Sequence, residues 1–328
     1  MEVSTLEWAI TIGVTVAVLL FDVVVIARNP HEPTLRECWI ALSVYISAAV
    51  VFGVWVLFFH GHDFGVQFFA GWLTEYSLSI DNLFVFIILM AALKVPRKYQ
   101  QEALMVGIIL ALIFRAIFIA LGYQLIENFS FVFYIFGAFL VYTAYSLVKS
   151  YRSHDEEHPE DNAVVKFAQS HLKVGDEYRG LKLWYQENGA RVVSPMLIVV
   201  VALGTTDILF ALDSIPAIFG ITQEPYLVFT ANVFALMGLR QLYFLLGGLL
   251  KRLVYLSLGL SFILAFIGVK LVLHALHENE LGFINGGEHV AVPEISALVS
   301  LGVIIVTLIV TAVLSLAKDK RDREDANA

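Results

Sequence analysis

The feature that most constrains this chain is a series of nine apolar windows, each about 20 residues or longer. An α-helix rises about 1.5 Å per residue, so such a window spans the roughly 30 Å hydrocarbon core of a bilayer. Apolar residues make up 59% of the chain and charged residues 15%, which excludes an ordinary soluble domain. The sequence predicts an all-α polytopic membrane protein with spans near 7–27, 38–59, 68–93, 103–123, 129–148, 194–219, 226–250, 253–273 and 295–316.

The basic residues predict the orientation of these spans, because cytoplasmic loops are enriched in Lys and Arg. With the N-terminus outside, the inner loops and tail hold eighteen of the 21 basic residues. The other three, Arg115, Arg240 and Lys270, lie inside predicted helices. The C-terminus is therefore expected in the cytoplasm. The net charge of −8 comes mostly from the aqueous loops and does not suggest a nucleic-acid partner.

The windows divide the chain into six predicted regions. The regions are two N-terminal helices (1–67), a first three-helix unit (68–149), a cytoplasmic polar loop (150–193), a second three-helix unit (194–273), an extracytoplasmic loop (274–292), and a ninth helix with a charged cytoplasmic tail (293–328).

Both polar loops contain residues that a metal ion could use. The inner loop includes SHDEEHPEDN, but it also carries six Lys and Arg, which favours a solvated linker over a metal sensor. The outer loop is either a weak ion site or a hydrophilic connector, and the connector is favoured. Its candidate residues are His274, His277, Glu278, Glu280, Glu288 and His289.

Two predicted spans carry carboxylates where hydrocarbon is expected. Residues 75–82 read EYSLSIDN inside the window 68–93, and residues 205–219 read TTDILFALDSIPAIF inside the window 194–219. A carboxylate at the bilayer centre costs roughly 2.5–3.5 kcal/mol on insertion scales unless it has a partner. These acids are therefore expected to have a functional role or a buried counter-charge.

The acidic segments belong to an internal repeat. Its two units, 68–148 and 194–273, each hold three spans, so they are predicted to enter the membrane from opposite sides as an inverted repeat. Transporters built this way place their substrate site near the midplane, where the units meet. The matching residues, expected to share one polar centre, are Glu75 with Asp207, Asp81 with Asp213, Asn82 with Ser214, and Arg115 with Arg240.

Helix geometry limits how the paired acids can work. A separation of six residues turns a side chain by about 600° and lifts it about 9 Å, so Glu75 and Asp81 point about 120° apart. They can serve one site only if the helix is distorted, or each faces a different stage of a path. Pro216 supplies a cause of distortion in the second unit, because it leaves the carbonyl of Leu212 without its helical partner.

Four carboxylates exceed two arginines, which favours a cation site over ion pairs that only hold the bundle together. The arginines are assigned a structural role, because a guanidinium opposes a metal ion. Asn232 is a further neutral candidate, and Asp22 is expected to face water or Arg28. The predicted metal ligands are Glu75, Asp81, Asn82, Asp207, Asp213 and Ser214, with Arg115 and Arg240 as structural charge partners.

The chemistry of these ligands indicates the ion. Carboxylate, amide, hydroxyl and carbonyl oxygens suit magnesium, calcium or manganese, and the acidic segments contain no Cys or His. The predicted cargo is a hard divalent cation. No prosthetic group and no catalytic residue are predicted, and the partners expected are the cation and the lipid bilayer.

Three motifs carry a family resemblance: EYSLSIDNLFVF (75–86), DILFALDSIPAIFGIT (207–222) and FTANVFALMGLRQLYFLLGGL (229–249). They resemble the TerC family of integral membrane proteins, which is named for tellurium resistance and related to the lysine-exporter superfamily. The resemblance implies manganese export across a bacterial plasma (inner) membrane, with the motif acids as the metal site. Many relatives have a glutamate where this chain has Gly204, which bears on metal preference and affinity.

Two other classes of function fit parts of the sequence. An accessory membrane protein of tellurite or envelope stress resistance would use the polar loop and tail for docking, without transport of its own. An intramembrane aspartyl protease would use two membrane aspartates, but such enzymes carry GxGD at the second one. Here the corresponding residues read GTTD (204–207) and ALDS (211–214), so the chain is expected not to be an enzyme.

Overall fold

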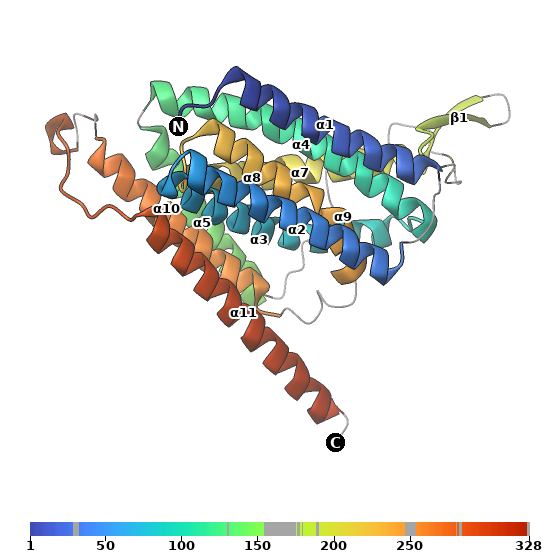
Figure 1. Ribbon diagram of the computed structural model, residues 1–328. Helices are drawn as coiled ribbons and strands as arrows, with labels where there is room; N and C mark the ends of the chain where they lie inside the picture. The colour runs from blue at the N-terminus through green and yellow to red at the C-terminus, as the bar shows by residue number, and fades with distance from the viewer. Residues whose placement is uncertain are drawn as a thin grey trace.

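The computed structural model describes most of the chain, and the polar loop is described only in part. The described residues are 1–28, 33–129, 131–153, 175, 178, 180–187, 190–246, 254–279, 281 and 284–326. The elements, shown in Figure 1, are α1 (Thr5–Arg28), α2 (Leu35–Phe59), α3 (His62–Ala92), α4 (Arg97–Asn128), α5 (Val132–Ser153), β1 (Trp184–Glu187), β2 (Ala190–Val193), α7 (Pro195–Phe219), α8 (Pro225–Met237), α9 (Leu239–Leu246), α10 (Leu256–His277), a 3-10 turn (Asn285–Gly287) and α11 (Ala297–Ala326).

The all-α membrane fold class is confirmed. Within the described ranges, nine segments are helical, long and apolar enough to cross a membrane, and each matches one predicted window. The helix starts follow local chemistry. Thr34 caps α2 through a reciprocal pair of hydrogen bonds with Glu37, and Ser194 caps α7 ahead of Pro195.

The predicted span 226–250 differs in detail, because it is divided at Gly238 into α8 and α9. A methyl group added at Gly238 would lie 3.2 Å from Leu42 Cδ1 and 3.5 Å from the Tyr76 hydroxyl. The glycine therefore lets α2 and α3 approach the point where the two helices meet. The predicted distortion at Pro216 is not seen as a break, since α7 runs through it to Phe219 and Gly220 N–H bonds the Pro216 carbonyl at 3.0 Å.

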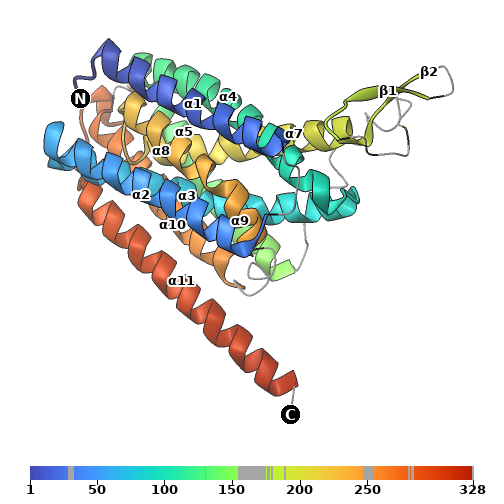
Figure 2. The same cartoon turned by 45° about the vertical axis from the view of Figure 1, so that its right-hand side comes forward.

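A β-hairpin lies at the end of the polar loop 150–193, which was predicted to be a solvated linker. Strands β1 and β2 pair antiparallel, and the hairpin projects beyond the start of α7 in both ribbon views (Figures 1 and 2). The signal was present in the sequence, since Asn188 and Gly189 form the dipeptide most typical of a two-residue hairpin turn. Residues 154–162 of the SHDEEHPEDN segment lie outside the described residues, so the expectation for this segment stays a prediction.

Three helix pairs form the centre of the bundle: α3 with α8, α4 with α7, and α5 with α10. Helices α4 and α7 run in the same direction, because Gly107 packs on Leu203 near their starts and Gly122 packs on Phe219 near their ends. Helix α3 runs opposite to α4 across the short turn between them, and is therefore antiparallel to α7. Helices α3 and α7 also contact each other directly.

The three central helix pairs are related by a simple exchange. Replacing α3 by α7, α4 by α8 and α5 by α10, and the reverse, gives the same three pairs. Helices α3 and α8 also run in the same direction, since Gly71 packs on Ala231 and Tyr76 packs on Gly238. This is the pairing expected of two units inserted in opposite directions. The inverted repeat itself stays a prediction.

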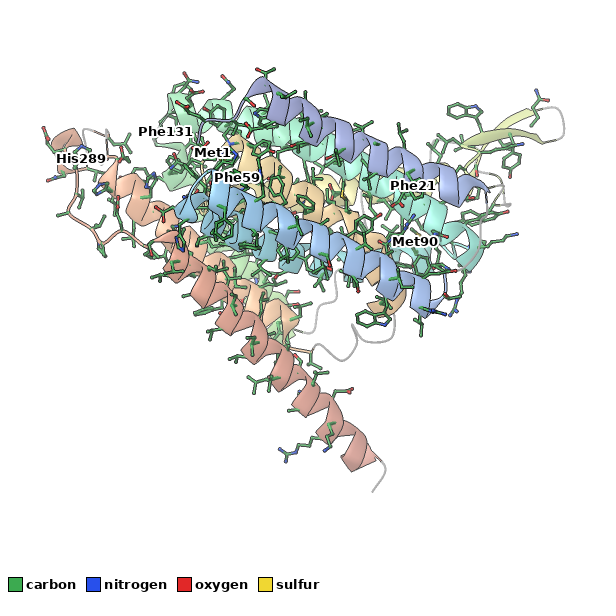
Figure 3. All side chains as sticks on the ribbon, viewed as in Figure 1. Met1, Phe21, Phe59, Met90, Phe131 and His289 are labelled. Atoms are coloured by element: carbon green, nitrogen blue, oxygen red, sulfur yellow. The ribbon has the colours of Figure 1, made fainter. Side chains whose placement is uncertain are left out.

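Helices α1, α2 and α11 lie on the outside of the bundle (Figures 1 and 2). Their outer faces carry large exposed apolar side chains, including Phe21 and Phe59, which Figure 3 labels. In a water-soluble protein such faces would be a liability. In a membrane protein they are the surface that meets lipid.

Candidate cation site

A buried ion-pair cluster joins α3 and α7, the two acidic helices, which carry the four predicted carboxylates. Arg115 on α4 contacts Glu75 on α3 through Nη1, and its Nη2 lies 3.4 Å from Oδ1 of Asp207 on α7. All three side chains are at least 96% buried. The guanidinium therefore bridges two carboxylates that occupy matching positions in the predicted repeat.

A fourth helix joins this cluster through Asn232 on α8. Arg115 Nη1 donates a hydrogen bond to Asn232 Oδ1 at 2.9 Å, and Asn232 Nδ2 donates to the Val228 carbonyl at 3.0 Å. Asn232 was one of the neutral ligand candidates. Its oxygen is instead used by the arginine, so α3, α4, α7 and α8 are tied together at one point.

The cluster contains more negative than positive charge. With both carboxylates ionised, one guanidinium against two acids leaves a net charge of −1 inside the membrane. Asp207 Oδ2 is buried and has no hydrogen-bond partner among the described residues. A buried charge excess is costly, so this arrangement favours a cation or proton nearby.

The positions of Asp81 and Asp213 follow from their helices, because their side chains lie outside the described parts of the structure. Asp81 is six residues beyond Glu75, and Asp213 is six residues beyond Asp207. Helices α3 and α7 run in opposite directions, so these two steps, each about 9 Å along the helix, lead toward opposite ends of the pair. This geometry favours successive stages of a path over one shared site.

The neutral candidates Asn82 and Ser214 are buried on the same two helices, with exposed fractions of 7% and 0%. Asn82 follows Glu75 by seven residues, and Ser214 follows Asp207 by seven. Two full turns separate each pair, so each neutral residue lies on the same helix face as its acid. Each acidic helix therefore presents a carboxylate and a neutral oxygen on one buried face.

Arg240 does not join the central cluster, so the prediction that both arginines share one polar centre is wrong for the described residues. Arg240 Nη2 lies 3.4 Å from Asp22 Oδ2 on α1, and the Tyr45 hydroxyl on α2 donates to the same oxygen at 2.9 Å. Helices α1 and α2 lie outside the predicted repeat and supply this partner. Asp22 was expected to face water or Arg28; the structure gives it Arg240 and Tyr45 as partners, and the Arg28 side chain lies outside the described residues.

The described side chains do not form a complete metal site. No three His, Cys, Asp or Glu residues among them lie close enough together to hold an ion. Two of the residues predicted for the outer loop, His274 and His277, lie in the last turn of α10. His277 pairs with Glu294 at 3.3 Å and His274 with Gln223 at 2.8 Å, while Glu280 lies outside the described ranges. A metal path would therefore depend on Asp81 and Asp213 together with neutral oxygens.

Comparison with known proteins places these features in a family context. The family model described as "Integral membrane protein TerC family" matches residues 60–323. An uncharacterized membrane protein of Mycobacterium tuberculosis is 45% identical over all of this chain and 83% of its own length. The "Thylakoid membrane protein TERC, chloroplastic" of Arabidopsis thaliana is 35% identical over 89% of this chain and 72% of its own.

A further relative carries a different kind of name. The "Putative membrane-bound redox modulator Alx" of Escherichia coli is 32% identical over 90% of each chain. No solved structure matches this chain. The matched region begins just before α3, so it contains both acidic helices, Arg115 and Arg240.

Proposed function

Because this chain belongs to the TerC family of integral membrane proteins, we propose that it transports a hard divalent cation, with Mn²⁺ as the cargo and Ca²⁺ or Mg²⁺ as weaker competitors. The direction proposed is efflux from the cytoplasm. The location proposed is the plasma (inner) membrane of a bacterium, with the N-terminus outside and the C-terminus in the cytoplasm. The reaction is transport, and no enzymatic step is proposed.

One observation carries the proposal: two antiparallel membrane helices that contact each other both present buried carboxylates, and these exceed their counter-charge. Glu75 and Asp207 share a single arginine, and the chain places two more aspartates on the same helices. An intramembrane carboxylate without a partner marks an ion or proton pathway. Since the ligands are all oxygen, the pathway suits hard cations.

The two stages proposed lie on either side of the central cluster. A cation reaches Asp81 and Asn82 on α3 from one side, and Asp213 and Ser214 on α7 from the other. The cluster of Glu75, Arg115 and Asp207 lies between these steps along the helices. Movement of one unit against the other would pass the ion between the two stages.

The test is Mn²⁺ uptake by purified protein in liposomes, comparing the wild type with Asp81→Asn and Asp213→Asn. We expect each substitution to reduce uptake about 100-fold or more, because a carboxylate ligand is lost in a low-dielectric site. Asp63→Asn is the matched control, since Asp63 lies on α3 but its side chain is 94% exposed. It should keep the wild-type rate.

Two outcomes would contradict the proposal. Wild-type rates in both aspartate variants would remove the carboxylate mechanism. A wild-type protein that is folded but moves no Mn²⁺, Ca²⁺ or Mg²⁺ would instead favour an accessory role in stress resistance. Competition among the three ions in the same liposomes ranks them as cargo.

A further inference from the structure

Serine and threonine side chains in these membrane helices usually satisfy their hydroxyl groups within their own helix. The hydroxyl of Ser77 donates to the Leu73 carbonyl at 2.6 Å, four residues earlier. Thr205, Thr230 and Thr307 do the same with the carbonyls four residues before them, at 2.7 to 2.8 Å. This local bond is the normal solution for a hydroxyl that cannot reach water.

Three buried Ser and Thr hydroxyls lack such a local bond. Thr74 and Ser79 on α3 and Ser214 on α7 have side chains with no exposed surface. Their oxygens have no hydrogen-bond partner among the residues that the structure describes. All three lie on the two acidic helices. A buried polar atom without a partner is rare and calls for a ligand or water that completes it.

Ser79 is the one of these hydroxyls on α3 that lies on the same face of the helix as Glu75. It follows Glu75 by four residues and precedes Asn82 by three, and residues at these spacings share a face. Gly71, four residues before Glu75, lies on the same face, and a methyl group added there would lie 3.9 Å from Ile218 of α7 and 3.7 Å from Ala231 of α8. Ser79 therefore belongs to the surface of α3 that is turned toward α7 and α8.

We propose that Ser79 is a ligand-facing residue of the cation path and helps to set its preference for hard ions. The proposal rests on the transport function proposed above and names a residue that the family motif acids do not include. A neutral hydroxyl oxygen binds hard ions such as Mn²⁺ directly or through a water molecule. A sulfur atom at the same position would favour softer ions.

The chain provides a control in Ser261 on α10. Both serines are buried, but the Ser261 hydroxyl donates to the Leu258 carbonyl at 2.7 Å within its own helix, whereas the Ser79 hydroxyl has no partner among the described residues. Ser77 is not used as the control, because it precedes Asp81 by four residues and shares its face of α3. The same substitution at Ser79 and Ser261 therefore separates an effect on the ion from the general cost of replacing a buried serine.

The experiment compares Ser79→Ala, Ser79→Cys, Ser261→Ala and Ser261→Cys in purified full-length protein. We expect Ser79→Ala to raise the KM for Mn²⁺ uptake into liposomes about fivefold. We expect Ser79→Cys to make Cd²⁺ about tenfold more potent as an inhibitor of Mn²⁺ uptake. The Ser261 variants should stay within about twofold of the wild type on both measures.

A binding measurement makes the test independent of transport. Added Cd²⁺ should give the ultraviolet absorption of a cadmium–thiolate bond with Ser79→Cys, and not with Ser261→Cys or with the wild type, which contains Cys38 alone. No absorption and unchanged Cd²⁺ inhibition in Ser79→Cys, with wild-type Mn²⁺ uptake intact, would overturn the role of Ser79. Equal effects at both serines would overturn it as well.

The two proposals fail in different ways. If the wild type moves no Mn²⁺ but Ser79→Cys gives the thiolate absorption, cation binding at this face stands and transport falls. If neither transport nor absorption is found, both proposals fall. If transport is normal and Ser79→Cys gives neither the thiolate absorption nor stronger Cd²⁺ inhibition, only the inference about Ser79 falls.

Discussion

Arg115 and Arg240 occupy matching positions in the two predicted units, and yet their surroundings differ. Arg115 is 1% exposed and binds acids from α3 and α7, whereas Arg240 is 11% exposed and binds Asp22 of α1. The matching sequence therefore does not give matching environments. The difference arises because α1 and α2 lie outside the repeat and cover one side of the bundle only.

The contrast also assigns different tasks to the two arginines. Arg115 neutralises part of the charge at the contact between the two acidic helices and ties four helices together. Arg240 attaches α9 to the N-terminal pair through Asp22 and Tyr45. One arginine belongs to the candidate path, and the other belongs to the scaffold around it.

The largest effect is expected from Arg115→Leu. It leaves Glu75 and Asp207 buried without a counter-charge, so the free energy of unfolding should fall by about 3–5 kcal/mol. Thermal unfolding in detergent measures the loss. The control is the triple variant Arg115→Leu/Glu75→Gln/Asp207→Asn, which removes the stranded charges and should recover part of the stability. A loss below about 1 kcal/mol for Arg115→Leu would contradict a stabilising role for the ion pairs of this cluster.

A smaller effect is expected from Arg240→Leu, about 1–3 kcal/mol in the same measurement. Asp22 keeps 16% of its side chain exposed and still has the Tyr45 hydroxyl, so its charge is less stranded than those of Glu75 and Asp207. The companion variant Asp22→Asn should cost a similar amount. If Arg240→Leu proved as destabilising as Arg115→Leu, the proposed difference between the two environments would be wrong.

The smallest effect is expected from Tyr45→Phe, which removes the 2.9 Å hydrogen bond to Asp22 and leaves the ring in place. A loss of about 1–2 kcal/mol is expected for a bond to a charged group. Combining Tyr45→Phe with Arg240→Leu tests whether the two residues act on the same carboxylate. A double variant whose loss equals the simple sum would argue against such coupling.

Some of the candidate site was predictable from the sequence and some was not. The buried acids Glu75 and Asp207 were identified because a carboxylate is rare inside a long apolar window. Their common partner Arg115 was among the predicted structural residues. The bond to Asn232 was not predicted, since it joins residues 117 positions apart that no local pattern connects.

The sequence by itself determined the number and location of the membrane spans. Burial of about 20 consecutive apolar residues in lipid is a property of each window, and it does not depend on which helices become neighbours. The positions of the intramembrane charges follow in the same way. They were fixed as soon as the windows were known.

Only the tertiary structure decided how those charges are paired. An ion pair inside a membrane forms between whichever opposite charges the packing brings within about 4 Å, and packing depends on every contact along the helices. Asp22 of α1 pairs with Arg240 of α9 because the fold brings these two side chains together. Arg115 pairs with two acids because α3, α4 and α7 pack at one point. The break at Gly238 depends on contacts with α2 and α3 in the same way.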